Sequence, residues 1–357
     1  MHRTADPPLI PPQAVLSFDV EEHWRIEAAS GLAFDAAGKG YYAGRVGASL
    51  RWLLDELARH DQRATFFVVG QLAREQPGLV RAIRDGGHEV ASHGWDHRRV
   101  HHFTPQTFRA DLRRTRDELE QITGAAVVGY RAPTFSIVRQ TAWALDVLAE
   151  EGVRYDSSIY PVRHDRYGVP DAPRDPFLAR GAWHEILELP PARLDLLGLR
   201  LPAGGGGYFR LLPLFVTEAA LHQVLRRGRP PVAVLYFHPW EFDPDQPRLP
   251  LGRLSRFRTY VGIRRSRPRF AALLRRHHFV RAVDAVSLLE PHAARLPRFD
   301  VSGVPLAVPS GRRESASEGR IAAALARQPL AEVDQVVPVG VVVADHRRHL
   351  IPALQVE

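Results

Sequence analysis

Two histidines four residues apart, His93 and His97, are the residues of this chain whose types and spacing most directly suggest chemistry. They lie in the run Ser-His-Gly-Trp-Asp-His, directly after the short apolar stretch 88–91, which is typical of a buried strand. Neutral imidazole is a common ligand for divalent transition metals. A catalytic zinc normally takes three protein ligands and a water, so the pair needs a third ligand from elsewhere. Because a chain with 17 histidines also produces such pairs by chance, a purely structural pair is the alternative.

Carboxylates that could complete a metal site follow the first strand-like segment, residues 14–19. Asp19 and Glu21 share one face of an extended segment, whereas Val20 points the other way. Glu22 comes next, and a bulge in the chain would present it in place of Glu21. Two carboxylates that face two histidines would supply one metal ligand and one general base.

Three further reactive side chains end other strand-like segments: Arg131, Asp156 and His238. Functional residues of parallel β/α folds gather where strands end, so we expect these side chains to meet. His238 is suited to protonate a leaving group near neutral pH, and Asp156 could hold and polarise it. Arg131 could keep a base carboxylate ionised. The pattern predicts a metal-assisted amide or ester hydrolase.

The elements that position these residues alternate between strand and helix. Predicted strands are 14–19, 64–69, 89–92, 127–131, 183–189 and 232–238, with 279–283 as a weaker one. A helix is predicted after Thr104-Pro105, which supply an N-cap and a first-turn proline, and it ends at Gly124. This alternation indicates a parallel sheet. The turn after the first strand is acidic where a nucleotide-binding fold has a glycine-rich phosphate turn, so a β/α barrel fits better.

Composition excludes several functional classes. The net charge is +8, but the basic residues are almost all arginine and show no stripe with interleaved aromatics, so nucleic-acid binding is not expected. The chain has no cysteine, and hence no disulfide or thiolate chemistry. The first residues lack the apolar core of a secretory signal, and no apolar run is long enough to span a bilayer. We therefore expect a soluble, cytoplasmic protein.

Five short motifs closely resemble carbohydrate esterase family four, the polysaccharide deacetylases with a NodB-homology domain. In order along the chain they are Ser17-Phe18-Asp19, Ser92–His97, Arg131-Ala132-Pro133, Tyr155–Ser158 and Leu235–His238. Within that family the chain most resembles the branch found beside exosortase and PEP-CTERM exopolysaccharide loci. The segments that carry this finer likeness are 18–22, 204–210 and 237–241.

The resemblance implies an α/β protein with a distorted (β/α) barrel of the polysaccharide deacetylase type and a C-terminal extension. The likeness covers a NodB-homology domain at 14–290. Composition separately predicts a flexible segment at 1–13 and an extension of unknown role at 291–357, for which partial disorder and an accessory packing element are the two alternatives. The implied activity is removal of N-acetyl groups from an amino-sugar polysaccharide or its precursor, in exopolysaccharide biosynthesis. The partner is then an N-acetylated glycan. The implied cofactor is one divalent metal ion, with Zn²⁺ expected and other transition metals also compatible.

The implied roles can be assigned to single residues. Asp19 is the base and His238 the acid, with Arg131 orienting Asp19 and Asp156 tuning His238. The metal ligands are His93, His97 and Glu21, and the implied substrate-binding residues are Tyr208, Arg210 and Trp240.

The first motif departs from the family pattern, because Val20 stands where better-known members have a second, metal-binding aspartate. Glu21 or Glu22 must substitute for it, and we favour Glu21. Two alternatives follow from this departure. One is a metal-independent hydrolase of a small cyclic amide or ureide, as in the allantoinase-like relatives. The other is a non-catalytic sugar-binding member of an export locus.

Overall fold

The computed structural model describes residues 9–303 of the chain. Its strands are β1 Gln13–Val20, β2 Thr65–Val68, β3 Glu89–Ser92, β4 Gly129–Tyr130, β5 Tyr155–Asp156, β6 Phe177–Arg180, β7 Glu185–Glu188, β8 Leu194–Leu196, β9 Leu199–Leu201, β10 Val232–Phe237 and β11 Arg298–Asp300. Its α-helices are α1 Ala36–Arg59, α2 Gly70–Glu75, α3 Pro77–Asp85, α4 Pro105–Thr123, α5 Trp143–Glu150, α6 Gly206–Leu211, α7 Leu214–Arg227, α8 Arg253–Tyr260, α9 Ser266–Arg276 and α10 Ala282–Leu289. Two short 3₁₀ helices matter below, η6 Pro239–Phe242 and η7 Ile263–Arg265.

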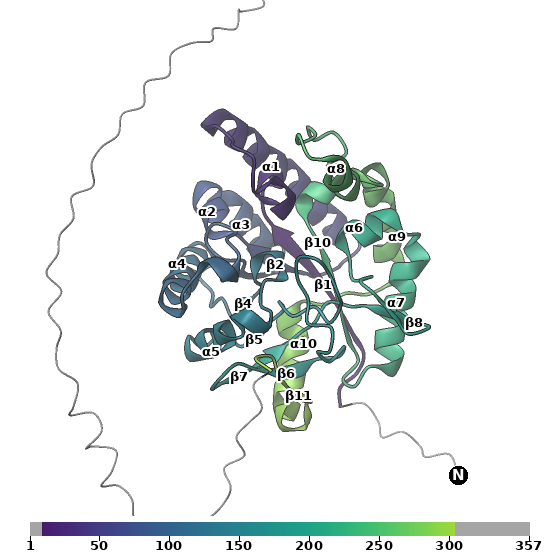
Figure 1. Ribbon diagram of the computed structural model, residues 1–357. Coiled ribbons are helices and arrows are strands. Elements are labelled where there is room, and N and C mark those ends of the chain that lie inside the picture. Colours follow the sequence, from purple (N-terminus) through teal and green to yellow (C-terminus); the bar gives the residue numbers. More distant parts are fainter. Residues whose placement is uncertain (1–8, 304–357) are drawn as a thin grey trace, which may run out of the picture. The chain divides into compact units, whose positions relative to one another are not determined.

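Nine of these strands form one curled sheet in the order β10-β1-β2-β3-β4-β5-β7-β6-β11. Every neighbouring pair is parallel except β6 and β7, which run antiparallel. Helices α1–α5 cover one part of the outer surface and α7 and α9 another (Figure 1). The predicted distorted (β/α) barrel is confirmed as a curled, mostly parallel sheet. Strands β8 and β9 form a separate hairpin.

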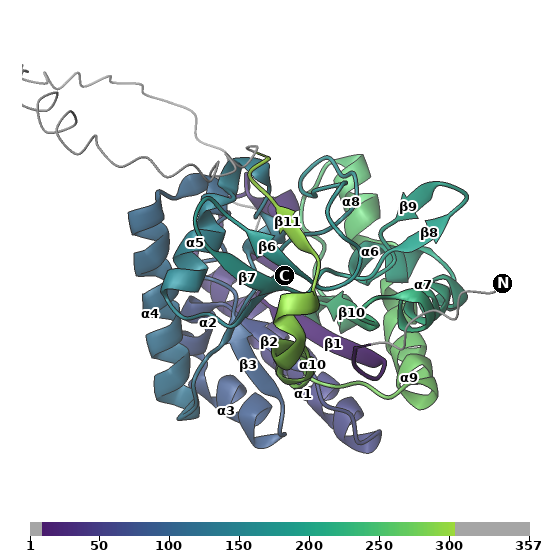
Figure 2. The same cartoon turned by 90° about the horizontal axis from the view of Figure 1, so that it is seen from below.

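Side-chain alternation along β1 explains how the sheet serves both the core and the site. Leu16, Phe18 and Val20 pack among the apolar side chains of the outer helices. Val15 points to the inner side, where it packs with apolar residues of α10. Figure 2 shows α10 lying across β1, β2 and β3. Asp19 has the same parity as Val15, so it lies on the inner side at the opposite, carboxyl end of the strand.

Local sequence signals set the helix ends. Thr104 caps α4, since its side chain accepts a hydrogen bond from the Thr107 N–H, and Pro105 occupies the first turn. Gly124 ends the helix in the left-handed conformation, with φ of 68°. These are the signals from which this helix was predicted, and its bounds are confirmed. Among the residues that the structure describes, no helix is both long enough and apolar enough to cross a membrane.

Three expectations about the elements need comment. The weak strand predicted at 279–283 is wrong: Val280 makes one isolated bridge to Val15, and α10 begins at Ala282. Strands β6 and β11 were not predicted, and β11 lies beyond residue 290, where we placed the end of the domain. Most of the predicted 1–13 segment and most of the predicted 291–357 extension lie outside the described residues.

Candidate active site

The carboxyl ends of β1, β3 and β10 surround a small cavity that is lined by both ionisable and aromatic side chains. Asp19 and Glu21 line it from the end of β1, His93 and His97 from the loop after β3, and His238 from the end of β10. The cavity has a volume of about 150 Å³, less than the roughly 300–1,000 Å³ of pockets that enclose a whole small molecule. It therefore suits one chemical group of a larger substrate. Parallel pairing of β1 with both β2 and β10 brings these residues together.

Three side chains of this cavity form a potential metal site. One ligand atom each of Glu21, His93 and His97 lies within 4.8 Å of the others. Glu22 points away and pairs with Arg25, whose Nε lies 2.5 Å from its Oε2, so the geometry favours Glu21 as the third ligand. No other group of three such side chains is found in residues 9–303.

The surroundings of these three residues fit a bound cation. His93 Nδ1 lies 2.8 Å from the carbonyl oxygen of Arg131, which can only accept, so Nδ1 carries the proton and Nε2 keeps its lone pair. Burial lowers the pKa of His93 to about 4, so the imidazole is neutral near pH 7. Glu21 Oε2 is buried in direct contact with His97 Nε2, and no donor other than this ring nitrogen lies against it. A cation between the two side chains would bind both atoms and offset the cost of burying the carboxylate.

Backbone strain is concentrated around the same cavity. His97, Thr134 and Phe135 line it, and all three have left-handed φ angles of 62°, 57° and 49°. Residues other than glycine avoid this region, at a cost of about 1–3 kcal/mol each. The surrounding structure thus holds the second histidine in a conformation that its local sequence does not favour.

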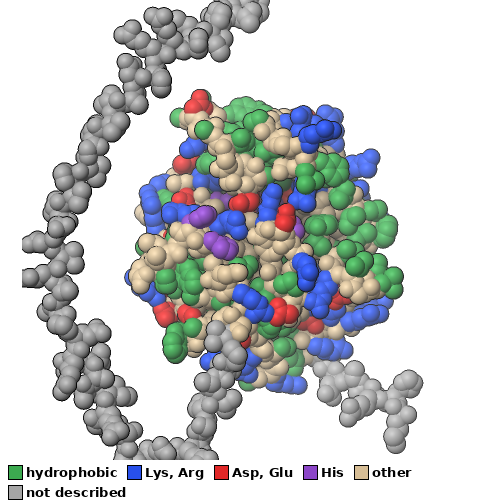
Figure 3. All heavy atoms as spheres, in the orientation of Figure 1, with side chains coloured by type: hydrophobic (Ala, Val, Ile, Leu, Met, Phe, Trp, Pro, Cys, Tyr) green, Lys and Arg blue, Asp and Glu red, His purple; other side chains and the backbone are tan. Residues whose placement is uncertain are grey.

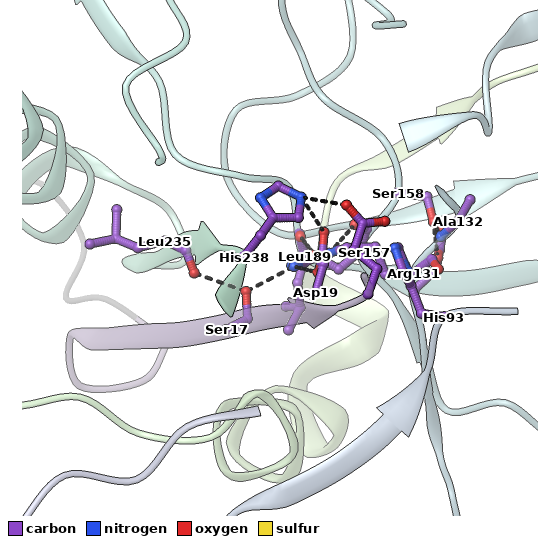
Figure 4. Close-up of polar contacts among 12 residues, drawn as sticks. Ser17, Asp19, His93, Arg131, Ala132, Ser157, Ser158, Leu189, Leu235 and His238 are labelled. Carbon is purple, nitrogen blue, oxygen red and sulfur yellow. Dashed lines mark hydrogen bonds and ion pairs between the residues drawn. The ribbon is translucent and has the colours of Figure 1, made fainter. Parts of the chain in front are cut away.

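Asp19 is fixed by a fully buried arginine. Arg131 Nη1 donates to Asp19 Oδ1 at 2.7 Å and to Ser17 Oγ at 2.9 Å, while Nε donates to the carbonyl oxygen of Ser157 at 3.1 Å. Burial favours the neutral acid, but the charges of Arg131, His93 and His238 outweigh it and lower the pKa of Asp19. Oδ2 remains directed toward His238 Nε2, 3.9 Å away. Figure 4 shows Asp19 and His238 pointing toward each other from their two strands.

His238 is held by Glu241, three residues further along in η6. Its Nδ1 lies 2.7 Å from Glu241 Oε1, and the other carboxylate oxygen accepts from Arg210 Nε at 2.7 Å. Burial lowers the pKa of His238, but the hydrogen bond to Glu241 and the charges of Glu21, Glu241 and Asp19 raise it to about 9. His238 is therefore protonated near neutral pH, with Nε2–H facing the cavity.

The predicted contact between Asp156 and His238 is wrong, because Glu241 takes that position. Asp156 is buried on β5, where its Oδ1 accepts from Ser158 Oγ at 2.5 Å. Its neighbour in the sheet is Glu188 of β7, and burial raises the pKa values of both carboxyls, that of Asp156 to about 6. The two acids share one proton behind Arg131, which explains how two buried carboxyls can lie side by side.

The three residues expected to bind substrate lie in different surroundings. Trp240 lines the cavity, stacks on His238 with ring centroids 5.3 Å apart and donates from Nε1 to Glu21 Oε1 at 3.5 Å. Arg210 does not face the cavity, and its assignment to substrate is corrected. Its guanidinium is buried against Glu241 and the carbonyl oxygens of residues 258, 259 and 261. Tyr208 is half-buried on α6 and is not one of the residues that line the cavity.

The glycine run before Arg210 packs against β10. Gly205, with φ of 147°, makes an isolated bridge to Tyr236, and a Cβ on it would lie 1.8 Å from the Tyr236 carbonyl oxygen. Only glycine allows this approach. The run therefore fixes the position of α6, and with it Arg210, relative to the end of β10.

Glu241 is the most important site residue that sequence reasoning missed, although it ends a quoted motif. The signal was its spacing. An acidic residue three positions after His238, at the start of a turn, can accept from both the backbone and the ring of that histidine. Ile26, Glu27 and Tyr167 also line the cavity, and nothing in the sequence marked them. Tyr236 lines it too; it lies in the motif Leu235–His238, but no role was assigned to it.

Two family models match stretches of this chain. Residues 30–155 match the family model described as polysaccharide deacetylase, and residues 157–287 match one described as a domain of unknown function, DUF3473. The chain carries a polysaccharide deacetylase domain. The family consists of hydrolases that act on amide carbon–nitrogen bonds. The metal-site histidines and Arg131 lie in the segment that matches polysaccharide deacetylase, His238 and Glu241 lie in the segment that matches DUF3473, and Asp19 and Glu21 precede both.

Curated relatives are similar to this chain over part of its length. A 90-residue stretch is 34% identical to peptidoglycan-N-acetylglucosamine deacetylase PgdA of Listeria monocytogenes, covering 25% of this chain and 19% of the relative. A 125-residue stretch is 29% identical to peptidoglycan deacetylase of Helicobacter pylori, covering 35% of this chain and 41% of the relative. The match thus spans about a fifth of the Listeria protein and two fifths of the Helicobacter protein.

Solved structures are similar over most of the chain. A Mycobacterium smegmatis protein described as a candidate polysaccharide deacetylase superposes with a TM-score of 0.54 at 22% identity, covering 82% of this chain and 94% of that one. Puue allantoinase superposes with a TM-score of 0.55 at 17% identity, covering 81% and 96%. These likenesses establish the fold.

Proposed function

We propose that this polysaccharide deacetylase domain hydrolyses the amide bond of N-acetyl groups on the amino sugars of a glycan or a glycan precursor. The observation that carries the proposal is the convergence of a metal-type triad, an ionised carboxylate and a protonated histidine on one small cavity. The names of the Listeria and Helicobacter relatives support the same chemistry on an N-acetylated glycan.

In the proposed reaction, water attacks the acetyl carbonyl carbon and the carbon–nitrogen bond breaks. Asp19 accepts the proton of the attacking water at Oδ2, which is the oxygen that Arg131 leaves free. His238 donates its Nε2 proton to the departing sugar nitrogen. The products are acetate and a free amine. Asp19 is buried and the side chain of His238 is only 19% exposed, so little bulk water reaches the two groups and their electrostatic interactions are strengthened.

Glu21, His93 and His97 are the residues that would hold a divalent cation, for which Zn²⁺ is the expected ion. When bound, such an ion polarises the acetyl carbonyl and acidifies the attacking water. Trp240 holds Glu21 through its indole N–H, and the carbonyl of Arg131 holds His93. We further propose that Tyr208 and Trp240 contact the sugar, and that the glycan belongs to exopolysaccharide biosynthesis.

The decisive experiment measures acetate release from a panel of N-acetylated glycans, with and without added Zn²⁺. Acetate release that a chelator stops and Zn²⁺ restores supports the proposal. Activity on a cyclic ureide such as allantoin that persists in chelator would refute it in favour of the metal-independent alternative. That alternative receives less support here, because three converging ligand atoms are unnecessary for it.

A further inference from the structure

The β8–β9 hairpin ends in leucines that project into solvent. Leu196, Leu197 and Leu199 are 50%, 95% and 62% exposed. Leu197 and Gly198 form the two-residue turn, with φ angles of 49° and 81°. Such a turn favours Asn-Gly, because its first position requires left-handed backbone. A leucine there is both strained and fully solvated, which indicates that its side chain serves a contact outside the described fold.

A second exposed apolar pair lies on α8, surrounded by positive charge. Leu254 and Phe257 occupy one side of the helix and are 62% and 54% exposed, and Arg253 and Arg256 are exposed beside them. The segment 246–283, which contains α8, has eleven arginines and not one aspartate or glutamate. An uninterrupted positive segment of this kind attracts anionic surfaces.

Contacts through the loop 163–170 join these two apolar sites. Arg258 of α8 lies 3.3 Å from Asp165, and Arg200 of β9 hydrogen-bonds to the carbonyl of Pro170. Figure 2 shows α8 and the β8–β9 hairpin projecting from the same side of the molecule. In Figure 3, hydrophobic and basic side chains lie interspersed along the right-hand side of the face shown. Tyr167 of the same loop lines the catalytic cavity, so this surface borders the site.

We propose that these side chains form a docking face that binds the surface of an anionic lipid bilayer. We define the docking face by its apolar and its basic members: Leu196, Leu197, Leu199, Leu254, Phe257, Arg253 and Arg256. The apolar side chains enter the boundary between headgroups and acyl chains, and the arginines pair with lipid phosphates. The core of a protein interface is depleted of charge, and a soluble polyanion gains nothing from exposed leucines. Because apolar and basic side chains occur together on this face, a bilayer is favoured as its partner.

The test is co-sedimentation of the full chain with vesicles of phosphatidylglycerol and phosphatidylcholine, compared with phosphatidylcholine alone. We expect binding to the anionic vesicles, with a loss of about fivefold for each of Arg253→Gln and Arg256→Gln. Leu197→Asn should weaken vesicle binding by at least about fivefold while leaving the melting temperature unchanged or higher, because asparagine suits the turn. If Leu197 served only the fold, Leu197→Asn would lower the melting temperature and leave vesicle binding unchanged.

Two matched controls lie away from the docking face. Trp183→Ser removes an aromatic side chain that is 81% exposed beside β7, and Arg81→Gln removes an exposed arginine of α3. Neither should change vesicle binding. The proposal is overturned if anionic vesicles do not bind at low salt. It is also overturned if Leu197→Asn binds as well as the original chain, which would indicate a purely electrostatic polyanion surface. Because this assay measures no hydrolysis, its result is independent of the proposed deacetylase activity.

Discussion

Replacing Glu241 by glutamine should move the alkaline limit of activity to lower pH. Glu241 accepts from His238 Nδ1 at 2.7 Å, and this bond, with the nearby carboxylate charges, keeps the pKa of His238 near 9. Glutamine preserves the size of the side chain and an acceptor oxygen but removes the charge. The protonated form of His238 is then stabilised less, so the proton that the mechanism requires is lost at lower pH.

The size of this shift follows from the strength of the lost bond. A hydrogen bond to a charged partner is worth about 1.5–3 kcal/mol, and one pKa unit corresponds to about 1.4 kcal/mol. The pKa of His238 should therefore fall by about 1–2 units. Arg210 also loses its anionic partner, although its three backbone carbonyl acceptors remain. Some loss of thermal stability should accompany the shift.

The assay is the pH dependence of kcat/KM for acetate release, at saturating metal, in the original chain and two variants. Glu241→Gln should lower the alkaline limb by about 1–2 units. Asp156→Asn should leave that limb in place, because Asp156 does not contact His238. The reasoning is refuted if Asp156→Asn moves the limb and Glu241→Gln does not.

Three further outcomes are expected. Asp19→Asn should reduce turnover by about 10²–10⁴-fold and retain the metal, whereas His97→Ala should lose both turnover and metal. Metal analysis of the purified variants measures this difference. Equal metal loss in the two variants would contradict the assignment of Asp19 as base and His97 as ligand. Burial holds the pKa of His88 near 4 in the fold against 6.5 when unfolded, so it contributes stability above pH 6.5 that is lost as pH falls toward 4. Between pH 6.5 and 4, the free energy of unfolding measured by chemical denaturation should therefore fall by about 2–3 kcal/mol less in His88→Gln than in the original chain. The same pH dependence in both chains would count against this role of His88. Gly205→Ala should destabilise the fold by more than about 2 kcal/mol, because its Cβ would lie 1.8 Å from a carbonyl oxygen of β10, whereas Gly78→Ala on open α3 should be neutral or stabilising in thermal melts.

The central strands could be predicted because they are buried on both faces; β1, β2 and β10 are also mostly apolar, whereas β3 is the short segment Glu-Val-Ala-Ser. Strands β1, β2, β3 and β10 were located within a residue or two for this reason. The peripheral strands β6 and β11 were missed. They are short, only partly buried and placed at the edge of the sheet, so no strong pattern identifies them.

The site was predictable where strand ends carry reactive side chains, and less so where a contact crosses the sheet. Asp19, Glu21, His93, His97 and His238 do meet in one cavity, as their positions at strand ends suggested. Whether Asp156 or Glu241 pairs with His238 depends on the direction in which each carboxylate points. That is decided by η6 and by the sheet register, which a linear pattern does not contain.

Strand β10 completes the sheet edge beside β1 although more than two hundred residues separate them, with Gln13 aligned to Val232. Until this pairing forms, His238 is not positioned opposite Asp19. Contacts between such distant segments form late and slow folding, because a long loop must close first. During synthesis at the ribosome, the catalytic apparatus therefore cannot assemble until the chain has grown past η6. A truncation between His97 and His238 leaves a chain that carries the metal ligands but not the proton donor.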